Sequence, residues 1–172
     1  MKKLILIALI IGITSLFKYN SEEYVVIPDE SIRFRVIASS NTKEDQALKK
    51  KVKENLKKEL FPLIKDARNI NEARESINQN FKRLSLNVKE TTKDNNYQIN
   101  YGKNYFPEKT YKGVKYPAGE YESLVVKLGD GVGKNFWCVL FPPLCLLEGE
   151  KEESNDVEYK FLVKEIIKKY FP

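Results

Sequence analysis

The two cysteines of the chain, Cys138 and Cys145, lie in the segment FWCVLFPPLC, where two prolines break an apolar run. Two cysteines can form a disulfide, contribute to a metal site or supply a nucleophilic thiolate. The sequence contains no histidine, which excludes a Cys–His catalytic pair and a zinc site of mixed ligands, and two thiolates alone are too few for structural zinc. A disulfide, a pair of buried free thiols and a redox-active or nucleophilic cysteine remain as interpretations.

Two other patterns could support chemistry. Glu120 and Glu122 would share one face of a β-strand, as the paired carboxylates of a hydrolase require. Glutamates that are simply exposed to solvent are, however, far commoner than catalytic ones. The glycine-rich segment GDGVGK, residues 129–134, could cradle a phosphate, but a strand pattern and not a helix follows it. We therefore expect a hairpin turn there, and we predict no catalytic, cofactor-binding or metal-binding residues.

The N-terminal segment predicts export. Lys2 and Lys3 precede an uncharged, mostly apolar stretch of 14 residues, 4–17, which Lys18 ends. Such a stretch forms a helix of about 21 Å, whereas a spanning helix needs about 20 residues. A basic start and a short apolar core are typical of a secretory signal, but no clear cleavage site follows. We predict a signal peptide or signal anchor over 1–20, with transient or anchored membrane association through 4–17.

Export bears on the cysteines, because thiols outside the cytoplasm tend to oxidise. This favours a disulfide between Cys138 and Cys145, which would close a ring of eight residues. Pro142 and Pro143 suit a turn or an edge inside that ring.

The formal net charge is +6, and Lys2, Lys3 and Lys18 account for half of it. The modest basicity left on the rest of the chain could favour an anionic membrane or wall polymer, and we expect no nucleic-acid partner.

Periodicity predicts a single globular α+β domain over 31–172, after a linker over 21–30. Ile32, Phe34 and Val36 alternate with Arg33 and Arg35, which predicts a strand with one apolar face. We expect the two arginines to be solvated, with a binding surface as the alternative.

Helices are predicted from Asn41 or Thr42 to about Pro62, which ends or interrupts the first, over about 71–93, and over 156–171. Strands are expected near 96–102, 120–128 and 135–140. The long connection between the first two of these is either functional or contains short strands. The order of elements predicts a two-layer domain, with a roughly four-stranded, mostly antiparallel sheet packed by helices mainly on one face.

Two long motifs are similar to those of the stage II sporulation protein R family of endospore-forming bacteria. They are IPDESIRFRVIASSNTKEDQALK and GVKYPAGEYESLVVKLGDGVGKNFWCVLFPPLC, and the resemblance covers most of residues 27–147. Phe136 stands where the family usually has a tryptophan, and Ser39 stands where asparagine is common.

The resemblance implies a signalling protein and not an enzyme. Members are exported from the forespore into the space between two membranes. There they activate a membrane-embedded aspartic protease of the mother cell, which processes the precursor of a sigma factor. The implied partner is that protease, acting as receptor, and no cofactor is implied.

We expect the receptor to contact an aromatic and proline-rich surface, since tyrosine and tryptophan are common binding anchors. The alternative is that these residues form the core and corner of a hairpin. The candidates are Tyr116, Pro117, Gly119, Tyr121, Phe136, Trp137, Phe141, Pro142 and Pro143.

Two other functions stay open on the sequence. One is an exported wall- or membrane-binding module that uses Arg33, Arg35 and the lysine-rich first helix. The other is a carboxylate-dependent wall hydrolase that uses Glu120 and Glu122.

Overall fold

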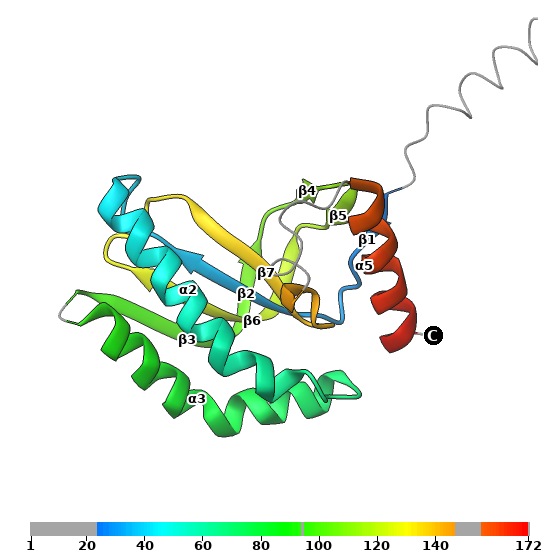
Figure 1. Ribbon diagram of the computed structural model, residues 1–172, viewed down its shortest axis with the longest axis horizontal. Helices are drawn as coiled ribbons and strands as arrows, with labels where there is room; N and C mark the ends of the chain where they lie inside the picture. The colour runs from blue at the N-terminus through cyan, green and yellow to red at the C-terminus, as the bar shows by residue number, and fades with distance from the viewer. Residues whose placement is uncertain (1–23, 94, 147–155, 172) are drawn as a thin grey trace, which may run out of the picture.

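The computed structural model describes residues 24–93, 95–146 and 156–171, and within them the predicted α+β fold is confirmed (Figure 1). In chain order the elements are β1 (Val25–Val26), β2 (Ile32–Ile37), α2 (Lys43–Ile64), α3 (Ile70–Thr92), β3 (Tyr97–Phe106), β4 (Lys109–Tyr111), β5 (Val114–Tyr116), β6 (Gly119–Leu128), β7 (Asn135–Phe141), the 3₁₀ turn η1 (Leu144–Leu146) and α5 (Asp156–Tyr170). The predicted signal segment, 1–20, lies outside the described residues. None of the helices in the described ranges is long and apolar enough to cross a membrane.

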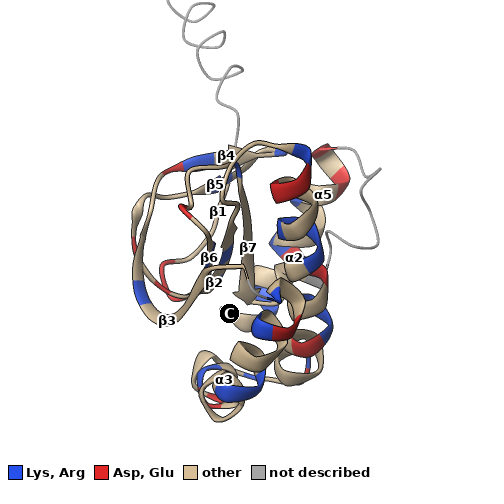
Figure 2. Cartoon of the chain, turned by 90° about the vertical axis from the view of Figure 1, so that its left-hand side faces the viewer, with Lys and Arg blue, Asp and Glu red and all other residues tan. Residues whose placement is uncertain are grey.

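The main sheet has four strands in the order β3-β6-β2-β7. β3 pairs with β6 and β7 pairs with β2 in antiparallel fashion, whereas β2 and β6 are parallel. The prediction of a mostly antiparallel sheet of four strands is thus confirmed. Both α2 and α3 cover the same face of this sheet, as Figure 2 shows from the side.

The two covering helices begin at side-chain caps. The hydroxyl of Thr42 accepts a hydrogen bond from the backbone N–H of Asp45, and Asn69 caps α3 in the same way. Every fourth residue of α2 faces the sheet and is buried, namely Val52, Leu56, Leu60 and Ile64. Pro62 was expected to end or interrupt this helix, but the helix continues to Ile64, so Pro62 lies within its last turn.

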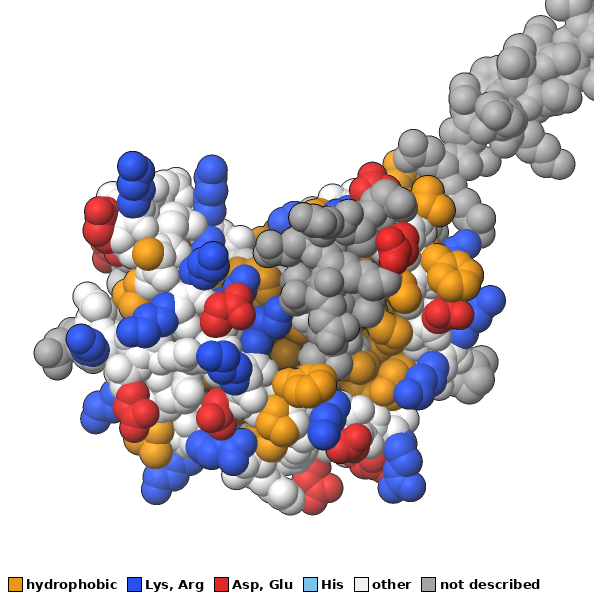
Figure 3. Space-filling view, in the orientation of Figure 1, with side chains coloured by type: hydrophobic (Ala, Val, Ile, Leu, Met, Phe, Trp, Pro, Cys, Tyr) orange, Lys and Arg blue, Asp and Glu red, His pale blue; other side chains and the backbone are white. Residues whose placement is uncertain are grey.

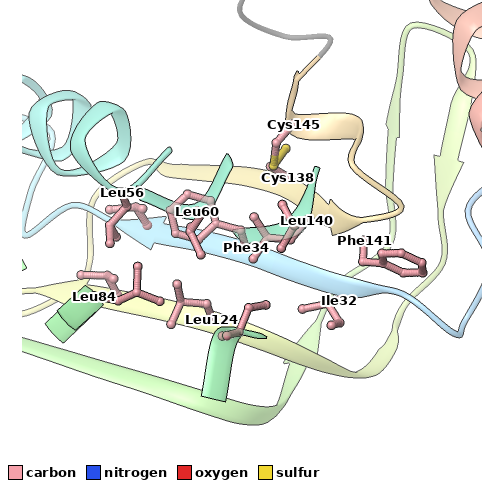
Figure 4. Packing of buried hydrophobic residues seen from close by; sticks show 14 of the residues in the cluster. Ile32, Phe34, Leu56, Leu60, Leu84, Leu124, Cys138, Leu140, Phe141 and Cys145 are labelled. Carbon is pink, nitrogen blue, oxygen red and sulfur yellow. A yellow bond between two sulfur atoms is a disulfide. The ribbon is translucent and has the colours of Figure 1, made fainter. Parts of the chain in front are cut away.

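The core fills the space between these helices and the sheet (Figure 4). Phe34 at the centre of β2 lies near Leu60 of α2, and Leu56 of α2, Leu84 of α3 and Leu124 of β6 belong to the same cluster. Polar side chains cover the outside of the helical layer, where lysines and arginines alternate with acids (Figure 3). The apolar half of each strand and helix is thereby removed from water, which supplies the main stabilisation.

A second, smaller sheet has the order β1-β5-β4. Two of its strands, β4 and β5, lie in the long tyrosine-rich connection, which was expected either to be functional or to contain short strands. Val25 and Ile27, from the segment expected to be a linker, are buried there with Tyr159 and Val163 of α5 and with Val139 of β7. This second cluster joins the start of the described chain to its last helix.

The predicted hairpin at 129–134 is wrong, because β2 lies between β6 and β7. The loop instead passes over the end of β2, where the N–H groups of Val132 and Gly133 donate to the carbonyls of Ser39 and Ala38. A Cβ at Gly133 would lie 2.2 Å from the carbonyl oxygen of Ser40, so this close backbone contact requires glycine. Gly129 and Gly131 do adopt positive φ angles.

Cys138 and Cys145 form a disulfide, with 5.6 Å between their Cα atoms. The bond joins β7 to η1 across the corner that contains Pro142 and Pro143. Both cysteines are buried in the main core cluster, so the bond fixes η1 against the end of β7.

We predict that the variant Cys138→Ala/Cys145→Ala loses about 2.5 kcal/mol of unfolding free energy, because the eight-residue ring no longer restricts the unfolded chain. Urea denaturation of the full chain in mild detergent measures the loss. Dithiothreitol should destabilise the parent chain and leave the double variant unchanged. Equal sensitivity of the two proteins to the reductant would contradict the assignment.

Candidate functional site

The face of the main sheet opposite α2 and α3 carries cationic and aromatic side chains. Alternation along β2 places Phe34 under the helices and therefore Arg33 and Arg35 on the other face. We call this surface the arginine face and define it by Arg33 and Arg35 of β2, Phe106 of β3, Tyr121 of β6 and Trp137 of β7.

Arg33 is buried on this face with only 2% of its surface exposed. Its guanidinium carbon lies 3.3 Å from the ring centre of Tyr121 and 5.5 Å from that of Phe106. One long hydrogen bond, of 3.5 Å, runs from Nη1 to the carbonyl of Pro117, while Nε and Nη2 have no partner among the described residues. The expectation that Arg33 is solvated is therefore wrong.

Burial lowers the pKa of the Arg33 guanidinium from its ordinary value, and Tyr121 leads the groups that oppose this shift. An arginine nevertheless keeps its proton in proteins. The site therefore holds a full positive charge whose stabilisation comes mainly from aromatic rings.

Asp29 lies close enough to act electrostatically on Arg33, but its carboxylate accepts from another group. The hydroxyl of Tyr121 lies 3.2 Å from Oδ1 of Asp29 and 3.0 Å from the carbonyl of Pro117. The segments before β2 and before β6 are thus joined through one tyrosine. No ion pair between Asp29 and Arg33 is formed.

Arg35 is half-buried and stands directly opposite Trp137 in the β2–β7 register. Its guanidinium carbon lies 4.2 Å from the tryptophan ring centre, and the ammonium of Lys109 lies 5.8 Å from the same centre. Burial lowers the pKa of Arg35 too. Trp137 therefore contacts two cations, of which Lys109 is exposed.

The predicted receptor-contact residues fall into two groups. Tyr116, Pro117, Gly119, Phe136 and Trp137 are half-buried, and Tyr121, Phe141, Pro142 and Pro143 are buried. Phe136 belongs to the helix side of the sheet, where its ring packs against Phe34. Tyr121 and Trp137 lie on the arginine face, and Pro117 touches it through its carbonyl.

The proline corner presents little surface in this structure. Phe141 packs its ring against Tyr170 of α5 at 5.0 Å between ring centres, and the Phe141–Pro142 peptide bond is cis. Pro142 and Pro143 connect β7 to η1 along the chain, and both are buried. Their burial favours a structural role, and receptor contact by any of the candidates stays a prediction.

Glu122 lies on the helix side of the sheet in an ion pair. Its carboxylate accepts from Arg74 of α3 at 2.8 Å and from the hydroxyl of Tyr101 at 2.7 Å. Burial alone would raise the pKa of this carboxyl, but the hydrogen bonds from Arg74 and Tyr101 outweigh it and lower the pKa. A carboxyl with a lowered pKa is ionised at neutral pH, which makes Glu122 a poor general acid.

Sequence reasoning missed Phe106 and Asp29 as parts of this surface. Phe106 ends a strand that was expected to stop near residue 102, and the signal for the longer strand is the alternation from Tyr97 through Tyr105. Among the residues that the structure describes, no group of three or more Cys, Asp or Glu side chains is arranged to hold a metal ion.

We predict that Glu122→Gln lowers the unfolding free energy by about 1.5 kcal/mol at pH 7, because hydrogen bonds to an ionised group are lost. Since the folded pKa is lowered, this stability is present above the unfolded pKa of about 4.3 and disappears as the pH falls through the folded value. Denaturation from pH 3 to pH 7 measures the trend. Glu75→Gln, an exposed change on α3, should cost less than about 0.5 kcal/mol. A difference that persists at pH 3 would contradict this account.

A family model and a curated relative both match this chain, and both carry the same family name. The family model described as stage II sporulation protein R matches residues 28–151. The curated stage II sporulation protein R of Bacillus subtilis (strain 168) is 39% identical over 139 residues, which cover 78% of this chain and 62% of that protein. The chain thus spans less than two thirds of the length of this relative. No solved structure matches. The arginine face, the loop 129–134 and the disulfide all lie within the matched range, and the chain belongs to the stage II sporulation protein R family.

Proposed function

We propose that this protein is an exported signal of sporulation that activates a membrane-embedded aspartic protease, which then processes the precursor of a mother-cell sigma factor. The observation that carries the proposal is membership of the stage II sporulation protein R family over residues 28–151. The basic and apolar N-terminal segment is consistent with export. The described residues of the matched range form a folded domain. We therefore propose that the signal acts through a folded surface and not as a short linear peptide.

Activation by binding requires a difference in affinity. A ligand shifts a receptor between two states only if it binds one of them better, and a tenfold shift needs about 1.4 kcal/mol of differential binding. A preorganised surface suits this purpose, because little ordering free energy is lost when it binds. The arginine face is such a surface, since each of its side chains projects from a paired strand of the main sheet.

The half-buried residues Tyr116, Pro117, Gly119 and Trp137 are the proposed receptor contacts. They lie on β5, β6 and β7 and on the connection between β5 and β6. All four residues retain exposed area that a partner could cover. Buried Tyr121 would not contact the receptor itself. Its hydroxyl would hold Pro117 and Asp29 in place through hydrogen bonds.

We expect that a non-sporulating host that produces this chain, the membrane-embedded protease and the sigma-factor precursor will accumulate the shortened precursor. Omitting this chain, or replacing the catalytic aspartate of the protease, should leave the precursor intact. Immunoblotting of the precursor measures the result. Cleavage without this chain, or no cleavage with all three proteins, would overturn the proposal.

Export can be tested in the same host. The variant Leu9→Lys/Ile10→Lys places two charges in the apolar segment, each costing about 2.5–3.5 kcal/mol in an apolar membrane environment. We expect it to abolish precursor cleavage while the protein accumulates in the cytoplasm. Lys2→Gln, which keeps the apolar segment intact, is the matched control. Full processing by the doubly charged variant would show that the signal acts without export.

A further inference from the structure

The cations of the arginine face form no ion pair among the described residues, and the acid that acts on Arg33, Asp29, accepts a hydrogen bond from Tyr121 instead. Its strand positions are Gln98, Asn100, Gly102, Asn104 and Phe106 on β3, Tyr121, Ser123, Val125 and Lys127 on β6, Arg33, Arg35 and Ile37 on β2, and Asn135, Trp137 and Val139 on β7. None of these residues is acidic. Arg33, Arg35 and the neighbouring Lys109 form no ion pair with any described carboxylate.

The helix side of the same sheet differs in this respect. There the cation of Arg74 is paired with the carboxylate of Glu122 at 2.8 Å. On the outside of the helices Glu59 pairs with Arg83, and Glu72 pairs with Arg68. Lysines without an ion pair are common elsewhere on the surface, but they are exposed, as Lys51 is. What distinguishes the arginine face is that its unpaired guanidinium groups are buried at Arg33 and half-buried at Arg35.

Hydrogen-bonding capacity is left unused at this place as well. The buried Nε of Arg35 and the buried Nε and Nη2 of Arg33 lack hydrogen-bond partners among the described residues. Buried donors without partners are costly, and those of a charged group are the most costly. A guanidinium stacked on an aromatic ring can still use its edge for hydrogen bonds, and Nη2 of Arg35 donates to the amide oxygen of Asn135 at 2.9 Å. Its Nε keeps no partner in the described part of the chain, and half-buried Arg35 is the one of the two arginines that a partner can reach.

Resting on the function proposed above, we infer that the arginine face binds an acidic segment of the receptor. One carboxylate of that segment pairs with the guanidinium of Arg35, while Trp137 provides the apolar floor beneath it. Lys109, at the rim of the face, attracts a second carboxylate. Charge-assisted hydrogen bonds to carboxylates are among the strongest contacts at protein interfaces, and their geometry gives specificity as well as affinity.

Trp137 is the single tryptophan of the chain, so the tryptophan emission of the full protein reports directly on this site. The test titrates the full chain, in nonionic detergent, with an octaglutamate peptide capped at both ends. We expect a saturable change in tryptophan emission that weakens with added salt. Octalysine, which has the opposite charge, should produce no change.

Variants locate the interaction. Arg35→Gln should weaken octaglutamate binding about tenfold, as expected when a charged hydrogen bond is lost. Arg35→Lys should give an intermediate affinity, because it keeps the charge without the planar fork. Lys109→Gln, an exposed substitution that does not disturb the fold, should weaken binding about twofold. Lys51→Gln removes an equal charge from the exposed side of α2 and should have no effect.

Equal loss of affinity in Lys51→Gln and Arg35→Gln would mean nonspecific charge attraction and would overturn the inference. So would the absence of any emission change in the parent protein. Vesicles that contain phosphatidylglycerol provide a further arm. If they change the emission in an Arg35-dependent way and octaglutamate does not, the face serves lipid and not an acidic segment.

The co-expression assay distinguishes failure of this inference from failure of the proposed function on which it rests. Arg35→Gln and Lys109→Gln should reduce precursor cleavage in proportion to their loss of octaglutamate binding. Full cleavage with both variants would overturn the inference and leave the proposed function intact. Absence of cleavage with the parent chain would overturn the proposed function, whatever the peptide titration shows.

Discussion

The position of β2 between β6 and β7 is the constraint on which the rest of this fold depends. A central strand must satisfy its hydrogen bonds on both edges and accommodate its side chains on both faces. β2 meets the first requirement by pairing in parallel with β6 and in antiparallel with β7. It meets the second in two different ways, with Phe34 in an apolar core and Arg33 against aromatic rings.

This constraint explains several features that are otherwise unrelated. Because β2 separates β6 from β7, the loop 129–134 has to cross the end of a strand at close range, and Gly133 permits the contact. Arg33 is buried without an ion pair to any described residue, and the rings of Tyr121 on β6 and Phe106 on β3 lie against its guanidinium. The small sheet and α5 then enclose the Val139 end of this face, while Arg35 and Trp137 stay accessible.

Local patterns of the sequence predicted the elements better than their arrangement. The four-residue spacing of Val52, Leu56 and Leu60 and the cap at Thr42 are local properties, and the first helix follows them closely. The insertion of β2 between β6 and β7 depends on strand pairs that are 90 to 109 residues apart in the sequence, which no local pattern encodes. A glycine-rich loop between two strands is typical of a hairpin, so the local pattern led us to expect that β6 pairs with β7. That expectation was wrong, because β2 lies between them. The environment of Arg33 could not be predicted either, since alternation places a residue on a face without saying what covers that face.

The short strand β1 has a consequence for where the domain can act. It begins at Val25 and is fixed by pairing with β5, and only residues 18–24 separate it from the apolar stretch that ends at Phe17. Seven residues reach about 25 Å at full extension. If the apolar stretch is retained in a bilayer, the folded domain must begin within about 25 Å of the lipid headgroups. An encounter with the proposed membrane-embedded receptor then becomes a search over a surface, at an effective concentration far above that of a freely diffusing ligand.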